Sequence, residues 1–170
     1  MTSLQKAHAL VDLRRHAEAR TEVTRVLARE PDSVHALCLL AQCELGLEKP
    51  AAALVATERA ITANPEFDWA LRLHALALAG LSRLREAREA ATAAVRAGPE
   101  EWLNHYVLAE TLSASGRHAE AYAVVRRAVE LAPEEPDTHV MHGVVANLTG
   151  RRREARAAYR EALRLDPESP

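Results

Sequence analysis

Five of the eight prolines in this chain recur at intervals of 34 residues, at Pro31, Pro65, Pro99, Pro133 and Pro167. A fixed period of this size is the signature of a repeat array, in which each repeat is one small structural element. Such an element cannot bury its apolar face alone, so it stacks on the next one along the chain. The spacing therefore predicts that the 170 residues fold as five stacked repeats.

Small residues recur in the same register. Helices approach to about 8 Å only where side chains are small, so a column of Ala or Gly marks a helix crossing. Aligning the repeats on their prolines gives three such columns: Ala7, Ala41, Ala75, Ala109 and Gly143; Ala19, Ala53, Ala87, Ala121 and Ala155; and Val26, Ala60, Ala94, Ala128 and Ala162. Ala56 lies outside the columns, and we expect it to tolerate a larger side chain better than Ala87 or Ala121.

Each repeat is predicted to hold two helices of similar length, a tight turn between them and a connector that contains the proline. Ala occurs 35 times, whereas Phe, Trp and Tyr together occur six times, which favours helix over sheet. Four of the turns have a glycine at or near them, where a positive φ is expected: Gly46, Gly80, Gly116 and Gly150. The predicted helices span residues 3–13, 16–29, 34–46, 51–63, 68–80, 84–97, 102–115, 118–131, 137–149 and 152–165.

This pattern resembles the tetratricopeptide repeat, which has small residues at fixed positions of both helices and a proline at the end. The fourth repeat matches through His105, Leu108, Ala109, Leu112, Ala121, Val125, Ala128 and Pro133. The fifth matches through His139, His142, Gly143, Ala146, Ala155, Tyr159, Ala162 and Pro167. Most of the family's large aromatics are replaced by Leu, His or Val, and Glu44 stands where an apolar residue is expected.

The resemblance covers essentially the whole chain and implies an all-α fold, a right-handed α-solenoid of tandem antiparallel helix hairpins. It implies a single domain over residues 1–170, with repeats of about 1–33, 34–67, 68–101, 102–135 and 136–170. Met1 runs directly into the first helix, for which Thr2 or Ser3 is a suitable cap, so this end is expected to be genuine.

Composition and motifs argue against several classes of protein. The sequence has no glycine-rich phosphate loop, H-E-x-x-H, C-x-x-C or G-x-S-x-G motif, so we expect no catalytic residues, cofactor or metal. A net charge of −2 argues against a general nucleic-acid binder. No apolar run of about 18 residues is present, so direct membrane insertion is not expected.

A cytoplasmic location is expected from the cysteines and the N-terminus. Cys38 and Cys43, five residues apart, point about 140° apart on one helix, which is too divergent for a disulfide. The first 20 residues lack the apolar core of a signal peptide. The 20 Arg against two Lys, together with the excess of Ala, indicate a bacterial source with a GC-rich genome.

Two groups of residues, a pair of histidines and a stripe of arginines, could be binding sites or could have only a structural role. His139 and His142 are three residues apart and could face one metal, but they occupy positions that hold Leu in other repeats, so packing is expected. A stripe of arginines on the last helix could meet an acidic partner, a phosphate backbone or an anionic membrane, although a solvated face is expected. The stripe consists of Arg152, Arg156, Arg160 and Arg164.

The resemblance implies that the first helix of each repeat lines a concave groove, which is where the family binds peptides. The residues predicted to face a partner there are Leu4, His8, His35, Cys38, Gln42, Trp69, Arg72, Leu76, Leu103, Tyr106, Glu110 and Val140. Trp69, Arg72 and Tyr106 are of the types most enriched in binding hot spots. The alternative is that Trp69 only packs onto its neighbours. A clamp for acidic C-terminal tails is not expected, because Arg72 is the only strong cation at the matching positions.

We therefore expect a non-catalytic scaffold that holds a peptide or helical segment of another protein in its groove. A second hypothesis is a structural module that self-associates through its last repeat, where no helix follows Pro167 to cover Tyr159, Leu163 and Leu165. A third is that the chain is the soluble repeat domain of a longer protein.

Overall fold

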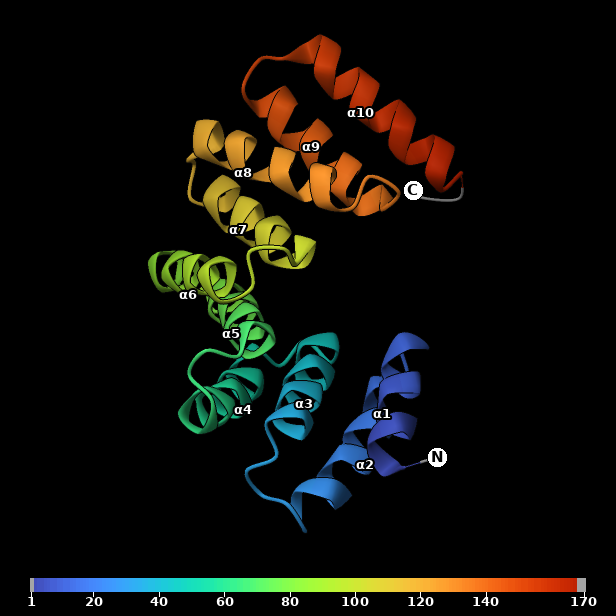
Figure 1. Ribbon diagram of the computed structural model, residues 1–170, viewed down its shortest axis with the longest axis vertical. Helices are drawn as coiled ribbons and strands as arrows, with labels where there is room; N and C mark the ends of the chain where they lie inside the picture. Colours follow the sequence, from blue (N-terminus) through green and yellow to red (C-terminus); the bar gives the residue numbers. More distant parts are fainter. Residues whose placement is uncertain (1, 168–170) are drawn as a thin grey trace. The chain divides into compact units, whose positions relative to one another are not determined.

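The computed structural model describes residues 2–167 and contains ten α-helices within them (Figure 1). They are α1 (Ser3–Asp12), α2 (His16–Leu27), α3 (Val34–Gly46), α4 (Pro50–Ala63), α5 (Asp68–Gly80), α6 (Leu84–Ala97), α7 (Trp102–Ala114), α8 (His118–Leu131), α9 (Pro136–Leu148) and α10 (Arg152–Leu165). Every predicted helix is present, and each boundary lies within two residues of its predicted place. Met1 and residues 168–170, which belong to the first and last predicted repeats, lie outside the described part.

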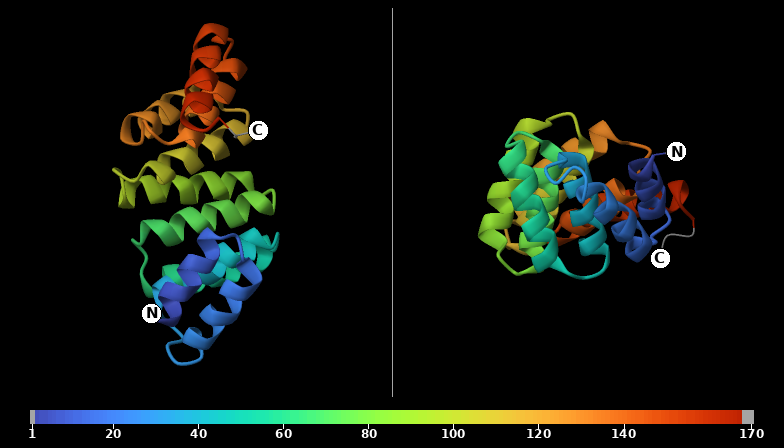
Figure 2. Two further views of the ribbon diagram at one scale, coloured as in Figure 1. Left: turned by 90° about the vertical axis from the view of Figure 1, so that its right-hand side faces the viewer. Right: turned by 90° about the horizontal axis from the view of Figure 1, so that it is seen from below.

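The helices form tandem hairpins in two bodies, Met1–Ala97 and Gly98–Pro170. The N-terminal body holds the hairpins α1–α2, α3–α4 and α5–α6, and the C-terminal body holds α7–α8 and α9–α10 (Figures 1 and 2). In each body a helix packs on the next along the chain, and the first helices also touch each other, α1 with α3, α3 with α5 and α7 with α9. The predicted all-α fold of tandem hairpins is confirmed, whereas the single domain over all 170 residues stays a prediction.

The three columns of small residues lie at the helix crossings. All of their members are buried except Val26, which is half-buried. The expectation for Ala56 is wrong, because its side chain is only 2% exposed and belongs to the core of the N-terminal body. The reason is that α4 packs against both α3 and α5, so a wider sector of this helix is covered than the columns alone indicate.

Positive φ angles occur at the turns, but only partly at the predicted glycines. Gly116 and Gly150 have φ of 74° and 79°, as expected. In two earlier turns the left-handed residues are Glu48 and Ser82, with φ of 58° and 60°. The prediction of positive φ at the glycines that precede these two residues is therefore wrong.

Those two glycines instead lie where neighbouring hairpins approach each other closely. Gly46 ends α3 and Gly80 ends α5. A Cβ atom added to Gly46 would lie 2.5 Å from the ring of His16, and one added to Gly80 would lie 2.9 Å from the Cβ of Pro50. Since His16 and Pro50 begin the second helices of the preceding hairpins, these glycines let consecutive hairpins pack closely.

The start of α1 is fixed by a capping box at Thr2, one of the two predicted caps. The Thr2 hydroxyl accepts a hydrogen bond from the Gln5 backbone N–H at 3.2 Å. In return the Gln5 Oε1 accepts one from the Thr2 backbone N–H at 2.8 Å. This exchange satisfies two of the amide groups that have no partner within a helix.

Two carboxylates are buried in the N-terminal body. Glu22 accepts hydrogen bonds from Lys6 at 2.6 Å and Arg25 at 2.9 Å, and the Lys6 bond lowers its pKa against the opposing effect of burial. Glu44, at a position where the family has an apolar residue, is 8% exposed and lies 3.6 Å from Arg20. Pairing with basic side chains from α1 and α2 makes these buried charges tolerable.

None of the helices within residues 2–167 is both long enough and apolar enough to span a bilayer.

The repeat register makes a prediction about overpacking. Ala121 of α8 is fully buried, so Ala121→Leu should lower the free energy of unfolding by about 1–3 kcal/mol, because the added carbons have no space. Ala123 of the same helix is exposed and provides the matched control. Urea denaturation of both variants measures the difference. Equal midpoints for Ala121→Leu and Ala123→Leu would show that the crossing is assigned to the wrong residue.

A second prediction concerns Gly143, where a Cβ atom would lie 2.5 Å from the ring of Tyr159. The same two positions of the preceding hairpin hold Ala109 and Val125, which are buried. Gly143→Ala should lower the free energy of unfolding by roughly 1–3 kcal/mol, although Ala is normally better than Gly in a helix. The double change Gly143→Ala/Tyr159→Val should recover most of the loss. A double-mutant cycle on the free energies of unfolding gives the coupling, and additive effects would contradict the proposed contact.

Candidate functional site

The first helices of the N-terminal body form a face that contains an open apolar pocket. Because α1 touches α3 and α3 touches α5, residues of all three helices meet there. The pocket has a volume of about 540 Å³ and is lined by Leu4, Gln5, His8, Ala9, Asp12, Ser33, His35, Leu39 and Trp69. Four residues predicted to face a partner, Leu4, His8, His35 and Trp69, are thus brought together.

Trp69 is the centre of this pocket because its ring lies beside rings from α1, from α3 and from the N-cap residue of its own helix. Its ring centroid lies 6.0 Å from that of His8, 6.3 Å from that of His35 and 6.2 Å from that of Phe67. His35 and Phe67 are 5.1 Å apart. The side chain of Trp69 is half-buried, so it packs onto its neighbours and also lines the pocket. Phe67 was not predicted, although its position two residues before Trp69 places both rings at the start of α5.

The prediction that Cys38 faces a partner is wrong. Cys38 is fully buried and cannot touch a partner, because α3 lies between α1 and α5 and its central residues are covered from both sides. Gln42, Arg72 and Leu76, predicted for the same face, are half-buried. The Gln42 Oε1 is buried and has no hydrogen-bond partner within residues 2–167.

The two cysteines are free thiols in the core. Burial raises the pKa of Cys38 to about 12 and that of Cys43 to about 11. The nucleophile and metal ligand is the thiolate, which such pKa values suppress at neutral pH. Neither thiol therefore contributes reactive chemistry to the pocket.

The C-terminal body presents a corresponding face on α7 and α9, which contact each other. Leu103 and Tyr106 of α7 and Val140 of α9 are half-buried there, and Glu110 is exposed. The Tyr106 ring packs edge-on against Trp102, with centroids 6.1 Å apart. Desolvation raises the pKa of Tyr106 to about 12, so its hydroxyl stays protonated and can donate a hydrogen bond.

Two histidines tie the connectors to the first helices, a role that was not predicted. The ring Nε2 of His105 hydrogen-bonds to the Pro99 carbonyl at 2.8 Å, and that of His139 to the Pro133 carbonyl at 2.7 Å. The sequence feature that could have predicted this role is a His six residues after the repeat proline in both cases. The packing predicted for His139 is confirmed, since it is 8% exposed.

His142, the other member of the predicted histidine pair, lies beside a tyrosine of α8. Its ring is half-buried and lies 5.8 Å from that of Tyr122, and burial lowers its pKa. Across residues 2–167, no group of three His, Cys, Asp or Glu side chains is placed to hold a metal ion.

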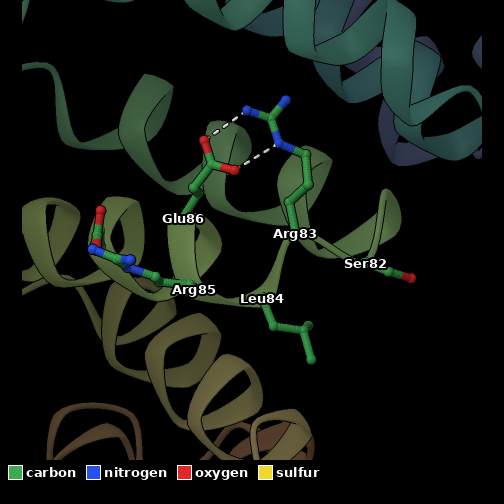
Figure 3. Close-up of a pocket in the computed structure, with 6 residues that line it drawn as sticks. Ser82, Arg83, Leu84, Arg85 and Glu86 are labelled. Carbon is green, nitrogen blue, oxygen red and sulfur yellow. Dashed lines mark hydrogen bonds and ion pairs between the residues drawn. The ribbon is translucent and has the colours of Figure 1, made fainter.

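A hollow of about 560 Å³ beside the α5–α6 turn carries no chemistry of its own. Figure 3 shows the two hydrogen bonds from Arg83 to Glu86, at 2.8 and 2.6 Å. Arg85 pairs with Glu89 at 3.1 Å. Both arginines pair with exposed glutamates three or four residues further along the chain, which is typical of a solvated surface.

The sequence matches family models of the tetratricopeptide repeat over most of its length. One model matches residues 4–68 and 72–136, and another matches residues 136–169. No curated protein sequence matches the chain significantly.

Several solved structures have a similar fold. One is TTC0263, a thermophilic tetratricopeptide repeat protein of Thermus thermophilus, with a TM-score of 0.90 and 24% identity over 98% of this chain and 91% of that chain. Another is MamA, with a TM-score of 0.73 and 17% identity over 95% of each chain. A third is YrrB, described as a repeat protein with an unusual peptide-binding site, with a TM-score of 0.67 and 17% identity over 98% of this chain and 86% of that chain.

The burial of the cysteines predicts slow thiol chemistry. In the native chain at pH 8, Cys38 and Cys43 should react with Ellman's reagent at least about tenfold more slowly than in denaturant, because burial keeps them protonated and inaccessible. Absorbance of the released thionitrobenzoate gives both rates. The variants Cys38→Ala and Cys43→Ala assign each phase to one thiol. A native rate as fast as the denatured one would contradict the placement of α3.

Proposed function

The chain belongs to the tetratricopeptide repeat family, and we propose that it is a non-catalytic scaffold that holds a peptide or helical segment of another protein. The proposed site is the face of α1, α3 and α5, centred on Trp69. The observation that carries the proposal is the open pocket at which Leu4, His8, His35 and Trp69 meet.

The lining of this pocket suits a segment with a bulky apolar side chain. Leu4, Ala9 and Trp69 provide apolar surface, while Gln5 and Asp12 add polar groups to the lining. Pockets that bind ligands commonly measure about 300–1,000 Å³ and combine an apolar lining with a few polar groups that fix orientation. An apolar anchor of the partner would pack against Trp69, the residue type most enriched in hot spots.

The histidines give this pocket its means of fixing a backbone. His8 and His35 are exposed, and each ring lies close to that of Trp69; an imidazole can both donate and accept a hydrogen bond. An extended or helical segment that crosses α1 and α3 would meet both rings. The peptide-binding site named for YrrB supports a peptide as the ligand of this fold, although at 17% identity the likeness extends to the fold alone.

We include the face of the C-terminal body in the proposal as a further contact surface. Leu103, Tyr106, Glu110 and Val140 lie on its first helices, and Tyr106 offers a protonated hydroxyl beside an apolar ring. Gln42, Arg72 and Leu76 extend the proposed surface of the N-terminal body. The two free thiols suit a reducing compartment, so we place this binding in the cytoplasm.

Peptides selected from a random displayed library against the whole chain test the proposal. Trp69→Ala should weaken the selected peptides by about 5- to 150-fold, which corresponds to roughly 1–3 kcal/mol, through loss of the anchor contact. His8→Ala removes an exposed side chain of the same pocket and should weaken them less, with the fold unchanged. Fluorescence anisotropy gives the dissociation constants.

Val55→Ala provides the control, because Val55 is 59% exposed on α4, a second helix of the same body. Circular dichroism melting curves show whether Trp69→Ala keeps its fold. Selected peptides that bind Trp69→Ala and His8→Ala as tightly as the parent chain would show that this pocket is not the site.

A further inference from the structure

The outer face of α10 exposes two large apolar side chains one helical turn apart. Tyr159 is 36% exposed and Leu163 is 53% exposed. Leu165, predicted with them as an exposed contact, is half-buried instead. Within its body α10 packs on α9 alone (Figure 1), so no helix of the described chain lies over these residues.

In other hairpins a helix covers the corresponding face. The next helix along the chain packs on it, α3 on α2, α5 on α4 and α9 on α8. The positions equivalent to Tyr159 are buried in these hairpins, and those equivalent to Leu163 are half-buried. These positions are Val23, Thr57 and Val125, and Leu27, Ile61 and Val129. The repeat geometry therefore makes an α-helix the natural occupant of this face.

Within α10, the charges that flank the two apolar residues are all positive. At 100° per residue, Arg152, Arg156 and Arg160 lie within about 60° of Leu163 around the helix axis. Glu154 and Glu161, the only acids of α10, lie about 160–180° away from Leu163. Along α10 itself, the exposed apolar stripe is thus bordered by arginines and not by the glutamates of the helix.

Within residues 2–167, the two acids of α10 are engaged by other partners than these arginines. Glu154 accepts a hydrogen bond from the Tyr122 hydroxyl at 2.5 Å, and Glu161 pairs with Arg164 at 2.7 Å. In the described residues, Arg152, Arg156 and Arg160 form no ion pair. All three are exposed. A covering helix that carried carboxylates would meet three free guanidinium groups, which form strong bidentate contacts with carboxylates.

We propose that this face of α10 binds an acidic amphipathic α-helix of another protein. Its apolar side would cover Tyr159 and Leu163, and its carboxylates would pair with Arg152, Arg156 and Arg160. This surface is separate from the pocket at Trp69, which lies in the N-terminal body.

Charge argues against a second copy of the chain as the occupant. Helix α10 holds five Arg and two Glu, a net charge of +3, so two such faces packed together would repel. A head-to-tail contact would offer α1 instead, which contains one Lys and one Asp and has no surplus of acid. Neither surface supplies the carboxylates that the arginines lack.

The test uses the whole chain and two labelled 18-residue peptides. Both peptides have Leu along one face of a helix; the remaining positions are rich in Glu in one peptide and in Lys in the other. The Glu peptide should bind, gain helicity in circular dichroism and bind more weakly as salt rises, while the Lys peptide should not bind. Leu163→Glu should weaken the Glu peptide at least about tenfold, because a carboxylate would then face the acidic helix. Arg156→Ala/Arg160→Ala should weaken it and flatten its salt dependence.

Val55→Glu, at an exposed apolar residue of α4, and Trp69→Ala should leave this binding unchanged, which separates it from the peptide site. Three results would overturn the proposal. One is equal binding by Leu163→Glu, and another is equal binding of a scrambled, non-amphipathic Glu peptide. The third is a dimer, measured by light scattering on the chain alone, that Leu163→Glu dissociates.

Discussion

Close crossing of helices at alanine is the constraint on which the rest of the structure depends. Ala41, Ala75 and Ala109 are fully buried on the first helices, and Ala53, Ala87 and Ala121 on the second. With so little side-chain volume at these points, each helix can pack on its partner and on the next hairpin together. The same small residues leave few large side chains for the core, so stability has to come from stacking along the chain. Both surfaces proposed for binding follow from this arrangement, because stacking within each body aligns its first helices on one face, and α10 packs on α9 alone.

The sequence predicted the helices well because the pattern that defines them is periodic and local. Ten helices followed from the 34-residue period, from Ala at fixed positions and from proline after each second helix. The failures came from contacts between hairpins, which no single repeat reveals. Ala56 was taken as tolerant although two helices cover it, and Cys38 was taken as accessible although it lies between two neighbours. Gly46 was assigned to a turn conformation, whereas the ring of His16 in the preceding hairpin is what requires glycine there.

The candidate site was predicted in its residue types more than in its geometry. Trp69, His8 and His35 do meet in one pocket, because stacking brings one face of α1 beside the starts of α3 and α5. Their mutual ring contacts, and the part of Phe67 in holding Trp69, depend on side-chain packing that spacing cannot specify. The hydrogen bonds of His105 and His139 to proline carbonyls were missed for a related reason. From the sequence, a histidine at a position that holds leucine in other repeats is expected to pack in the core. Only the structure shows that the carbonyl of the connector proline lies within hydrogen-bond distance of the ring.

Gly143 and Tyr159 link the internal packing of the last hairpin to its outer surface. Glycine in the middle of a helix costs about 1 kcal/mol relative to alanine, and the other repeats hold alanine at this position. Here the absence of a Cβ atom makes room for the Tyr159 ring, which rests on Gly143 while 36% of the residue stays exposed. A smaller residue, such as the Val125 of the preceding hairpin, would fill the hairpin interior without this cost. The tyrosine therefore packs on α9 and at the same time widens the apolar stripe beside the arginines of α10. A glycine at position 143 and a tyrosine at position 159 are therefore what we expect if a further helix covers this face of α10.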